Sequence, residues 1–248
     1  MSFTDLFSRD SQAYATFRPR YPSGLFAALA GLVTRHDAAW DAGTGNGQAA
    51  GALADHFSRV IATDASAAQI AAAEPHARVE FRVGRSEESG LVDASVDLVT
   101  VAQALHWFDI PAFFEEARRV LRPGGVIAVW TYGLLTIDPA IDAAIETFEF
   151  DVVGPYWPAQ RALVDSGYRT IDFPFDEIDV PRFAIEQPMS LDVLAGYIGT
   201  WSSVAGYRKA RGEDPVAPFI AGIADWWGDR SRARTVKWPV TVRAGRRA

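Results

Sequence analysis

Apolar segments alternate with helical patterns along the first part of the chain, up to residue 132. Five segments have the character of strands: apolar runs at 38–40, 60–63, 96–102 and 126–130, and an alternating pattern at 79–83. Apolar residues spaced three and four apart predict helices between most of them, at 25–33 with a cap near Ser23, and at 49–57, 65–73 and 112–121, with a turn at 123–125. This alternation predicts a parallel sheet with helices on both faces.

The pattern changes after residue 132, where no second alternating series follows. Helices are expected at 139–150, at 159–166 and within 190–227, and strands at 170–180 and 234–243. We therefore expect one α/β domain over 1–248 with a doubly wound, mostly parallel, seven-stranded sheet. Its core would span about 14–132, and 133–248 would supply the last two strands and an inserted helical lid.

A glycine-rich segment, Asp41-Ala-Gly-Thr-Gly-Asn-Gly47, follows the first predicted strand. Backbone without Cβ atoms at a helix start lets a ligand approach closely. The sixth position counted from Gly43 is Gln48, so the spacing departs from the dinucleotide fingerprint, and Asp41 would repel a pyrophosphate but attract a cation. Asp64 ends the second predicted strand, where a doubly wound sheet places an acid against ribose hydroxyls. The two acids predict a positively charged nucleoside as ligand.

Further motifs extend this picture: Phe17-Arg-Pro-Arg-Tyr-Pro22, Gln103-Ala-Leu-His-Trp-Phe-Asp109 and Leu121-Arg-Pro-Gly-Gly125. Together with the glycine-rich segment, they resemble the class I S-adenosylmethionine-dependent methyltransferases, and more narrowly the type 11 group that includes trans-aconitate methyltransferase-like proteins. The resemblance implies a Rossmann-like sheet with an antiparallel C-terminal strand. It also implies S-adenosylmethionine as cofactor, S-adenosylhomocysteine as product, and a small-molecule methyl acceptor, for which a carboxylate oxygen is one expectation.

The resemblance also implies a set of cofactor-binding residues at matching positions. Asp64 would hold the ribose hydroxyls, Arg18 would meet the α-carboxylate, and the pair Ser86-Glu87 would contact the adenine amino group. Many relatives have an aspartate where this chain has Ser86-Glu87. The expected set is Tyr14, Arg18, Asp41, Gly43, Gly45, Asp64, Ala65, Ser86, Glu87 and Gln103.

His106 and Trp107 follow the fourth predicted strand, at the expected edge of the cofactor site. A carboxylate acceptor is already ionised and needs only positioning, whereas a phenol, amine or carbon acid benefits from a general base, for which His106 is the candidate. The alternative is a structural histidine bonded to the backbone. Trp107, together with Trp201 and Tyr207 in the tail, is a candidate wall of the acceptor pocket, with plain core packing as the alternative.

Composition narrows the range of partners. The net charge of −7 opposes nonspecific attraction to nucleic acid or anionic lipid. No apolar run approaches the about 18 residues of a membrane helix, so we expect a cytoplasmic protein that binds neither nucleic acid nor membrane. The absence of cysteine and the dispersal of the four histidines predict that there is no metal site. The oligomeric state is left open.

Two other functions stay open for the same residues. A nicotinamide-dependent oxidoreductase would also use a glycine-rich loop and an acid at the end of the second strand. A noncatalytic protein that binds S-adenosylmethionine would keep the cofactor residues and need no productive acceptor site.

Overall fold

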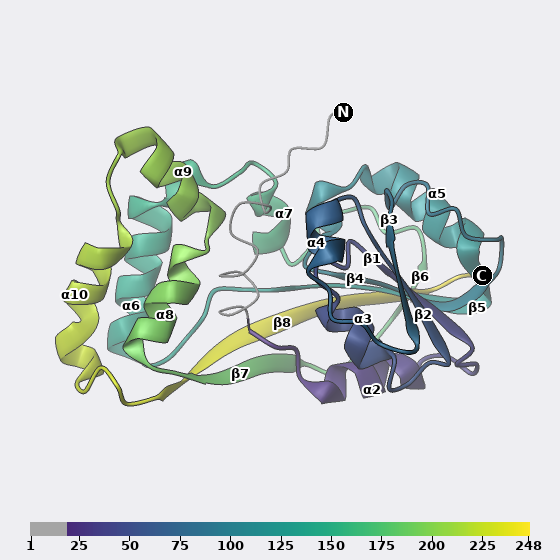
Figure 1. The fold of residues 1–248 in the computed structure, drawn as a ribbon, viewed down its shortest axis with the longest axis horizontal. Coiled ribbons are helices and arrows are strands. Elements are labelled where there is room, and N and C mark those ends of the chain that lie inside the picture. The colour runs from purple at the N-terminus through teal and green to yellow at the C-terminus, as the bar shows by residue number, and fades with distance from the viewer. Residues whose placement is uncertain (1–18) are drawn as a thin grey trace.

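The computed structural model describes residues 19–248, and its centre is a twisted, mostly parallel sheet (Figure 1). Five parallel strands lie in the order β3-β2-β1-β4-β5. Their bounds are β1 (Ala38–Ala42), β2 (Arg59–Asp64), β3 (Val79–Val83), β4 (Val96–Ala102) and β5 (Leu121–Tyr132). Because β1 pairs with β2 on one side and with β4 on the other, the chain order reverses beside β1, which is where such sheets bind ligands.

The tail completes the sheet with antiparallel strands. β8 (Arg234–Arg246) pairs with β5, and its other edge holds β6 (Asp176–Ile178) and β7 (Phe183–Met189). The sheet therefore has eight strands and not the expected seven. One strand at 170–180 was expected, whereas two strands, β6 and β7, pair with this edge of β8. The sequence pattern did not predict β7, which contains Pro188; proline lacks the N–H of a central strand but is tolerated at an edge.

Helices cover both faces of the sheet, and two of the four in this part begin at a side-chain cap. The helices of this part are α2 (Ser23–Gly31), α3 (Gln48–Leu53), α4 (Ala67–Ala71) and α5 (Ile110–Val120). The expected cap at Ser23 is wrong, because Ser23 is the first helical residue and Pro22 precedes it without a side-chain cap. α5 begins earlier than expected because the Asp109 carboxylate accepts a hydrogen bond from the Ala112 N–H.

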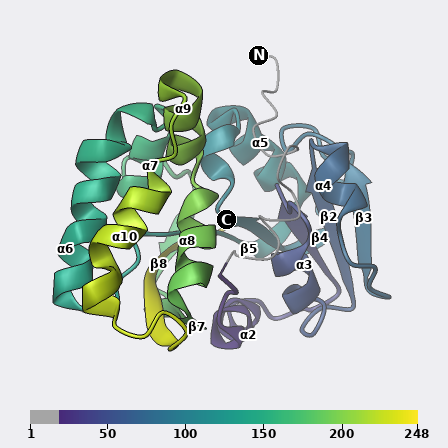
Figure 2. The ribbon, with the colours of Figure 1, turned by 60° about the vertical axis from the view of Figure 1, so that its left-hand side comes forward.

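Most of the remaining helices form a cap beyond the end of β7 and β8, and α7 lies between this cap and the sheet (Figures 1 and 2). α6 (Pro139–Thr147), η2 (Phe148–Val152), η3 (Gly154–Tyr156) and α7 (Arg161–Asp165) follow β5, whereas α8 (Leu191–Gly199), α9 (Ser202–Arg211) and α10 (Val216–Trp227) lie between β7 and β8. Among residues 19–248, no helix combines the length and the apolar character needed to span a membrane.

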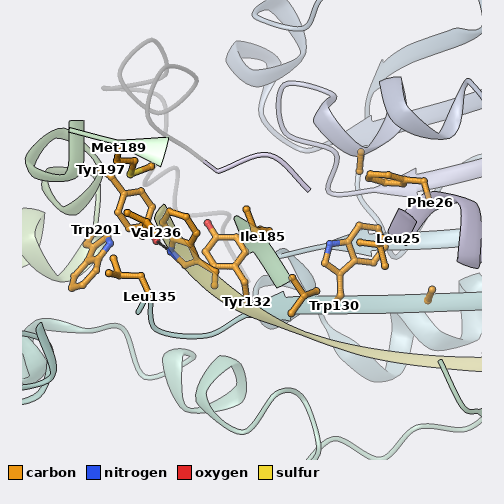
Figure 3. Packing of buried hydrophobic residues seen from close by; sticks show 14 of the residues in the cluster. Leu25, Phe26, Trp130, Tyr132, Leu135, Ile185, Met189, Tyr197, Trp201 and Val236 are labelled. Atoms are coloured by element: carbon orange, nitrogen blue, oxygen red, sulfur yellow. Dashed lines mark hydrogen bonds between the residues drawn. The ribbon is translucent and has the colours of Figure 1, made fainter. Parts of the chain in front are cut away.

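One hydrophobic cluster runs from the face under α2 into the cap (Figure 3). Trp130 packs against Phe26 of α2, with ring centroids 6.2 Å apart. Farther along the same cluster, Tyr197 of α8 contacts Trp201, with centroids 6.1 Å apart, and its hydroxyl accepts a hydrogen bond from the Trp238 indole N–H at 3.0 Å. The cap is thus fixed to the sheet by shared apolar packing.

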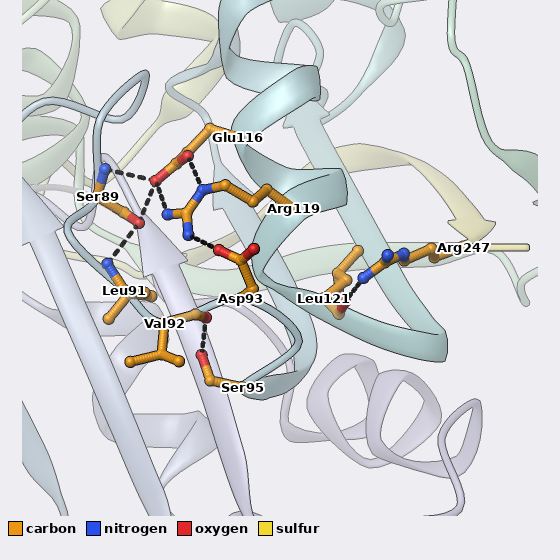
Figure 4. Close-up of polar contacts among 9 residues, drawn as sticks. All are labelled: Ser89, Leu91, Val92, Asp93, Ser95, Glu116, Arg119, Leu121 and Arg247. Carbon is orange, nitrogen blue, oxygen red and sulfur yellow. Dashed lines mark hydrogen bonds and ion pairs between the residues drawn. The ribbon is translucent and has the colours of Figure 1, made fainter.

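The loop after β3 is anchored to α5 by a buried acid (Figure 4). The Glu116 carboxylate accepts hydrogen bonds from the Ser89 N–H and from the Arg119 guanidinium, both at 2.8 Å. Burial alone raises the pKa of this carboxyl, but the bonds from Arg119 and Ser89 outweigh it, and the pKa of Glu116 is lowered. The loop that contains the expected adenine contacts is therefore held against α5.

Candidate active site

The glycine-rich loop joins β1 to α3, and the space around its three glycines differs. All three have positive φ, at +67° for Gly43, +58° for Gly45 and +88° for Gly47. A Cβ on Gly43 would lie 2.7 Å from Ala104 Cβ, and one on Gly47 would lie 2.6 Å from the Phe81 ring. A Cβ on Gly45 would meet only Gln69 Oε1, at 3.8 Å. Packing thus fixes Gly43 and Gly47, while Gly45 leaves room for a ligand.

Asp41 is the second-last residue of β1, directly before the loop, and is completely buried. Its carboxylate accepts hydrogen bonds from the hydroxyl of Thr44 at 2.6 Å and from that of Thr100 at 2.7 Å. Burial raises the pKa of Asp41 to about 6, the two threonine hydroxyls oppose that rise, and the nearby Asp64 adds to it. A buried carboxylate in this state gains from a neighbouring cation.

Asp64 ends β2 and connects it to the glycine loop. One carboxylate oxygen accepts a hydrogen bond from the Gly45 N–H at 2.8 Å, and the other accepts one from the Ser66 N–H at 2.8 Å. These two contacts orient the carboxylate at the end of β2. Ala65, another member of the expected cofactor set, is exposed next to it.

The expected adenine contacts lie after β3. Ser86 is buried, and Glu87 is half-buried. The Glu87 carboxylate accepts a hydrogen bond from the Asp109 N–H at 2.9 Å and pairs with Arg85 at 3.3 Å. The structure thus brings this loop to the start of α5, a contact that the sequence did not indicate. The expected residues Tyr14 and Arg18 lie outside the described residues.

A pocket lies between the ends of β4 and β5 and the cap. Four expected residues line it: Gln103, His106, Trp107 and Trp201. Tyr207 instead packs its ring against Tyr156, with centroids 5.1 Å apart, and is not among the described residues of the lining. The sequence did not single out Glu149, Trp157 and Arg161, which also line this pocket. We call it the acceptor pocket.

Two sets of partly buried hydrogen bonds lie beside the pocket. Gln103 Oε1 accepts from the Tyr132 N–H at 3.0 Å and from the Thr131 hydroxyl at 2.6 Å. The hydroxyl of Tyr168 lies 2.9 Å from His106 Nδ1. Burial raises the pKa of Tyr168, so its hydroxyl keeps its proton at neutral pH.

The contact between His106 and Tyr168 fixes the orientation of the imidazole ring. Its Nδ1 lies 2.9 Å from the Tyr168 hydroxyl, and which of the two atoms donates depends on the tautomer of His106. The contact therefore holds His106 in place at the edge of the pocket.

Comparison with known proteins identifies the family. Residues 40–129 match the family model described as a methyltransferase domain. A Mycolicibacterium smegmatis protein, to which S-adenosylmethionine-dependent methyltransferase activity is ascribed, is 41% identical over 112 residues, or 44% of this chain and 43% of that one. A Dictyostelium discoideum protein, to which methyltransferase activity is ascribed, is 37% identical over 222 residues, or 88% of this chain and 84% of that one. The chain belongs to the class I S-adenosylmethionine-dependent methyltransferases.

The fold of this methyltransferase agrees with the same assignment. A solved structure from Anaeromyxobacter dehalogenans, described as a type II methyltransferase, is 44% identical, has a TM-score of 0.88, and is matched over 93% of this chain and 98% of that one. The expected Rossmann-like sheet with an antiparallel C-terminal strand is confirmed. The oxidoreductase alternative is thereby set aside, while the trans-aconitate methyltransferase-like subgroup stays a prediction.

The glycine loop of the methyltransferase fits the cofactor of its family. Room above Gly45 allows close approach of a ligand, and the buried Asp41 favours a cation at the same end of the sheet. Asp64, held by two backbone N–H groups beside Gly45, can accept the hydroxyls of a ribose. The individual cofactor contacts of these residues stay predictions.

Proposed function

We propose that this methyltransferase transfers a methyl group from S-adenosylmethionine to a small molecule held in the acceptor pocket. S-adenosylmethionine, when bound, supplies a methyl group on a positively charged sulfur. The proposal rests on one observation: the end of β4 serves both sites. Gly43 of the glycine loop packs against Ala104, and the preceding residue, Gln103, lines the acceptor pocket. A molecule in that pocket is therefore next to the loop that fits the cofactor.

The protein's part in such a transfer is to orient the acceptor and keep water out. Large aromatic side chains of the pocket serve this purpose: Trp107 from η1 (Leu105–Trp107), Tyr132 from β5, and Trp157 and Trp201 from the cap. Trp157 and Trp201 lie against each other, with centroids 5.8 Å apart. Flat walls of this kind suit a flat acceptor.

The acceptor atom follows from the charges and proton acceptors of the pocket. A carboxylate oxygen, one expectation from the sequence, would need a cation to hold it. Among the described residues of the lining, Arg161 is the sole arginine or lysine, and it is already paired with Glu149 and Asp165, each at 2.6 Å. His106 lines the same pocket and can serve as the general base that a hydroxyl acceptor requires. These contacts favour a hydroxyl over a carboxylate.

Titration calorimetry tests the cofactor half of the proposal, and product analysis tests the other half. The protein should bind S-adenosylmethionine, and with a panel of phenols and aromatic carboxylates it should release S-adenosylhomocysteine and form methyl ethers rather than methyl esters. Binding of NAD without binding of S-adenosylmethionine would overturn the proposal. Methyl esters alone would keep the enzyme class and replace the hydroxyl by the carboxylate.

Replacing Asp64 with alanine should weaken S-adenosylmethionine binding by about 1–3 kcal/mol, because hydrogen bonds to a charged acceptor are lost. The variant also frees the Gly45 and Ser66 N–H groups, so Asp64→Asn, which keeps one acceptor oxygen, should lose less. Calorimetric dissociation constants of both variants measure the effect. An unchanged constant in Asp64→Ala would remove Asp64 from the ribose role.

A further inference from the structure

The cap side of the acceptor pocket contains two buried polar atoms that have no hydrogen-bond partner among residues 19–248. They are Glu149 Oε2, in η2, and the indole Nε1 of Trp157, just after η3. The Glu149 side chain is only 2% exposed, and both residues line the pocket. Leaving a buried donor and a buried acceptor unpaired costs stability, so such atoms call for a function.

Arg161 of α7 gathers these two residues around one guanidinium group. Its Nη2 donates to Glu149 Oε1 at 2.6 Å, and its Cζ lies 4.2 Å from the centre of the Trp157 ring. Its Nε donates to Asp165 at 2.6 Å, on the outer side of the helix, where Asp165 is half exposed. The Arg161 charge is therefore neutralised within the protein, while Glu149 Oε2 and Trp157 Nε1 remain for a ligand.

The chemistry of the two atoms defines the group that they can bind. Trp157 Nε1 can only donate. Burial raises the pKa of Glu149 and the charge of Arg161 opposes that rise; the ionised carboxylate of this ion pair can only accept. A hydroxyl group satisfies both, because it donates one hydrogen bond and accepts others. An ammonium group could not accept from Trp157, and a carboxylate would meet the negative charge of Glu149 with no uncompensated cation beside it.

We propose that Glu149 and Trp157 form a recognition site for a neutral hydroxyl group of the methyl acceptor, distinct from the hydroxyl that is methylated. This inference rests on the proposed function, because it takes the pocket to be the acceptor site. His106 faces the acceptor from the strand ends, and Glu149 with Trp157 faces it from the cap. The substrate class is thus a flat molecule with at least two hydroxyl groups, one methylated and one retained.

Three small probes of one shape test the recognition site by binding alone. The probes are para-methoxyphenol, which has one hydroxyl, para-dimethoxybenzene, which has none, and para-methoxybenzoate, which has a carboxylate in its place. Their dissociation constants are measured by ligand-observed NMR titration with S-adenosylhomocysteine present. We expect para-methoxyphenol to bind about tenfold more tightly than either of the other two, as befits one well-made hydrogen-bonded pair. Equal or weaker binding of para-methoxyphenol, or no binding at all, would overturn the proposal.

Two variants assign the preference to its residues. Glu149→Gln keeps the oxygen toward Arg161 and turns the inner acceptor into a donor, and Trp157→Phe keeps the ring but removes the N–H. Each should reduce the tenfold preference to about twofold or less. The matched controls Glu146→Gln and Trp226→Phe change exposed residues and should keep it. A preference that survives both pocket variants overturns the site; if Glu149→Gln does not fold, Trp157→Phe decides alone.

A turnover assay separates this proposal from the proposed function. With S-adenosylmethionine and hydroquinone, the wild type should form para-methoxyphenol, which mass spectrometry detects. If the binding preference is present and no product forms, the proposed reaction fails and the recognition site stands. If product forms without any hydroxyl preference, the reaction stands and the recognition site fails.

Discussion

Replacing His106 with alanine is expected to lower kcat for a hydroxyl acceptor by about a hundredfold to ten-thousandfold, the usual contribution of a positioned general base. The structure gives the reason, since His106 lines the acceptor pocket and its Nδ1 is held at 2.9 Å from the Tyr168 hydroxyl. The dissociation constant of S-adenosylmethionine should stay nearly unchanged. Single-turnover rates together with calorimetry measure the two effects separately.

Two further variants show whether the effect belongs to the base. Tyr168→Phe removes the hydroxyl that is hydrogen-bonded to Nδ1 and orients the ring, so it should lower kcat by about tenfold and change the pH profile of kcat while His106 remains. His76→Ala changes an exposed histidine and should alter neither quantity. If His106→Ala turns over at the wild-type rate at every pH, no base acts there, and an acceptor that is already ionised replaces the hydroxyl.

The bounds of two strands were predictable for different reasons. β4 agrees with the apolar run at 96–102 because it is almost entirely buried. β3 lies at the edge of the sheet and was predicted at 79–83 from its alternating pattern. The start of β5 was not predictable, since Pro123 and two glycines indicate a turn. In the structure, Leu121 still pairs with Val96, and the next pair is Val126 with Leu98, so these residues form an irregularity inside the strand.

The loops at the strand ends followed from the same regularity, because parallel strands bring their carboxyl ends to one edge. That Asp41, Asp64 and Gln103 lie at this edge could therefore be predicted from their positions at the ends of predicted strands. The link from His106 to Tyr168 could not, since the two residues are separated by 62 positions and no local pattern connects them.

The cap side of the pocket was the least predictable part of the site. Glu149 belongs to a helical pattern in which an acid ordinarily marks a solvated face, yet its side chain is only 2% exposed. It is buried because a π-helical turn follows α6 and because α7 brings Arg161 to it. The same folding places Trp157 under that arginine. Short helices joined by turns have too weak a periodicity to reveal such contacts in advance.

Asp41→Asn is expected to make the cofactor-free protein more stable at pH 7, by up to about 3 kcal/mol, and to weaken S-adenosylmethionine binding. Burial raises the pKa of Asp41 from 3.8 to about 6 in the folded protein. A carboxyl whose pKa is raised favours folding most below pH 3.8, and that contribution is lost as the pH rises to about 6. Asparagine carries no charge to bury and no charge to attract a cation.

Urea unfolding of both proteins between pH 4 and pH 8 measures the first effect, and calorimetry at pH 7 measures the second. The stability difference between Asp41→Asn and the wild type should grow from pH 4 to about 6 and stay constant above that. Asp55→Asn, an exposed matched change, should follow the wild type throughout. Parallel curves for Asp41→Asn and the wild type would show that the buried charge costs nothing, and undiminished cofactor affinity would show that it attracts nothing. Higher stability together with weaker cofactor binding in Asp41→Asn would show that the charge of Asp41 serves binding and lowers the stability of the cofactor-free protein.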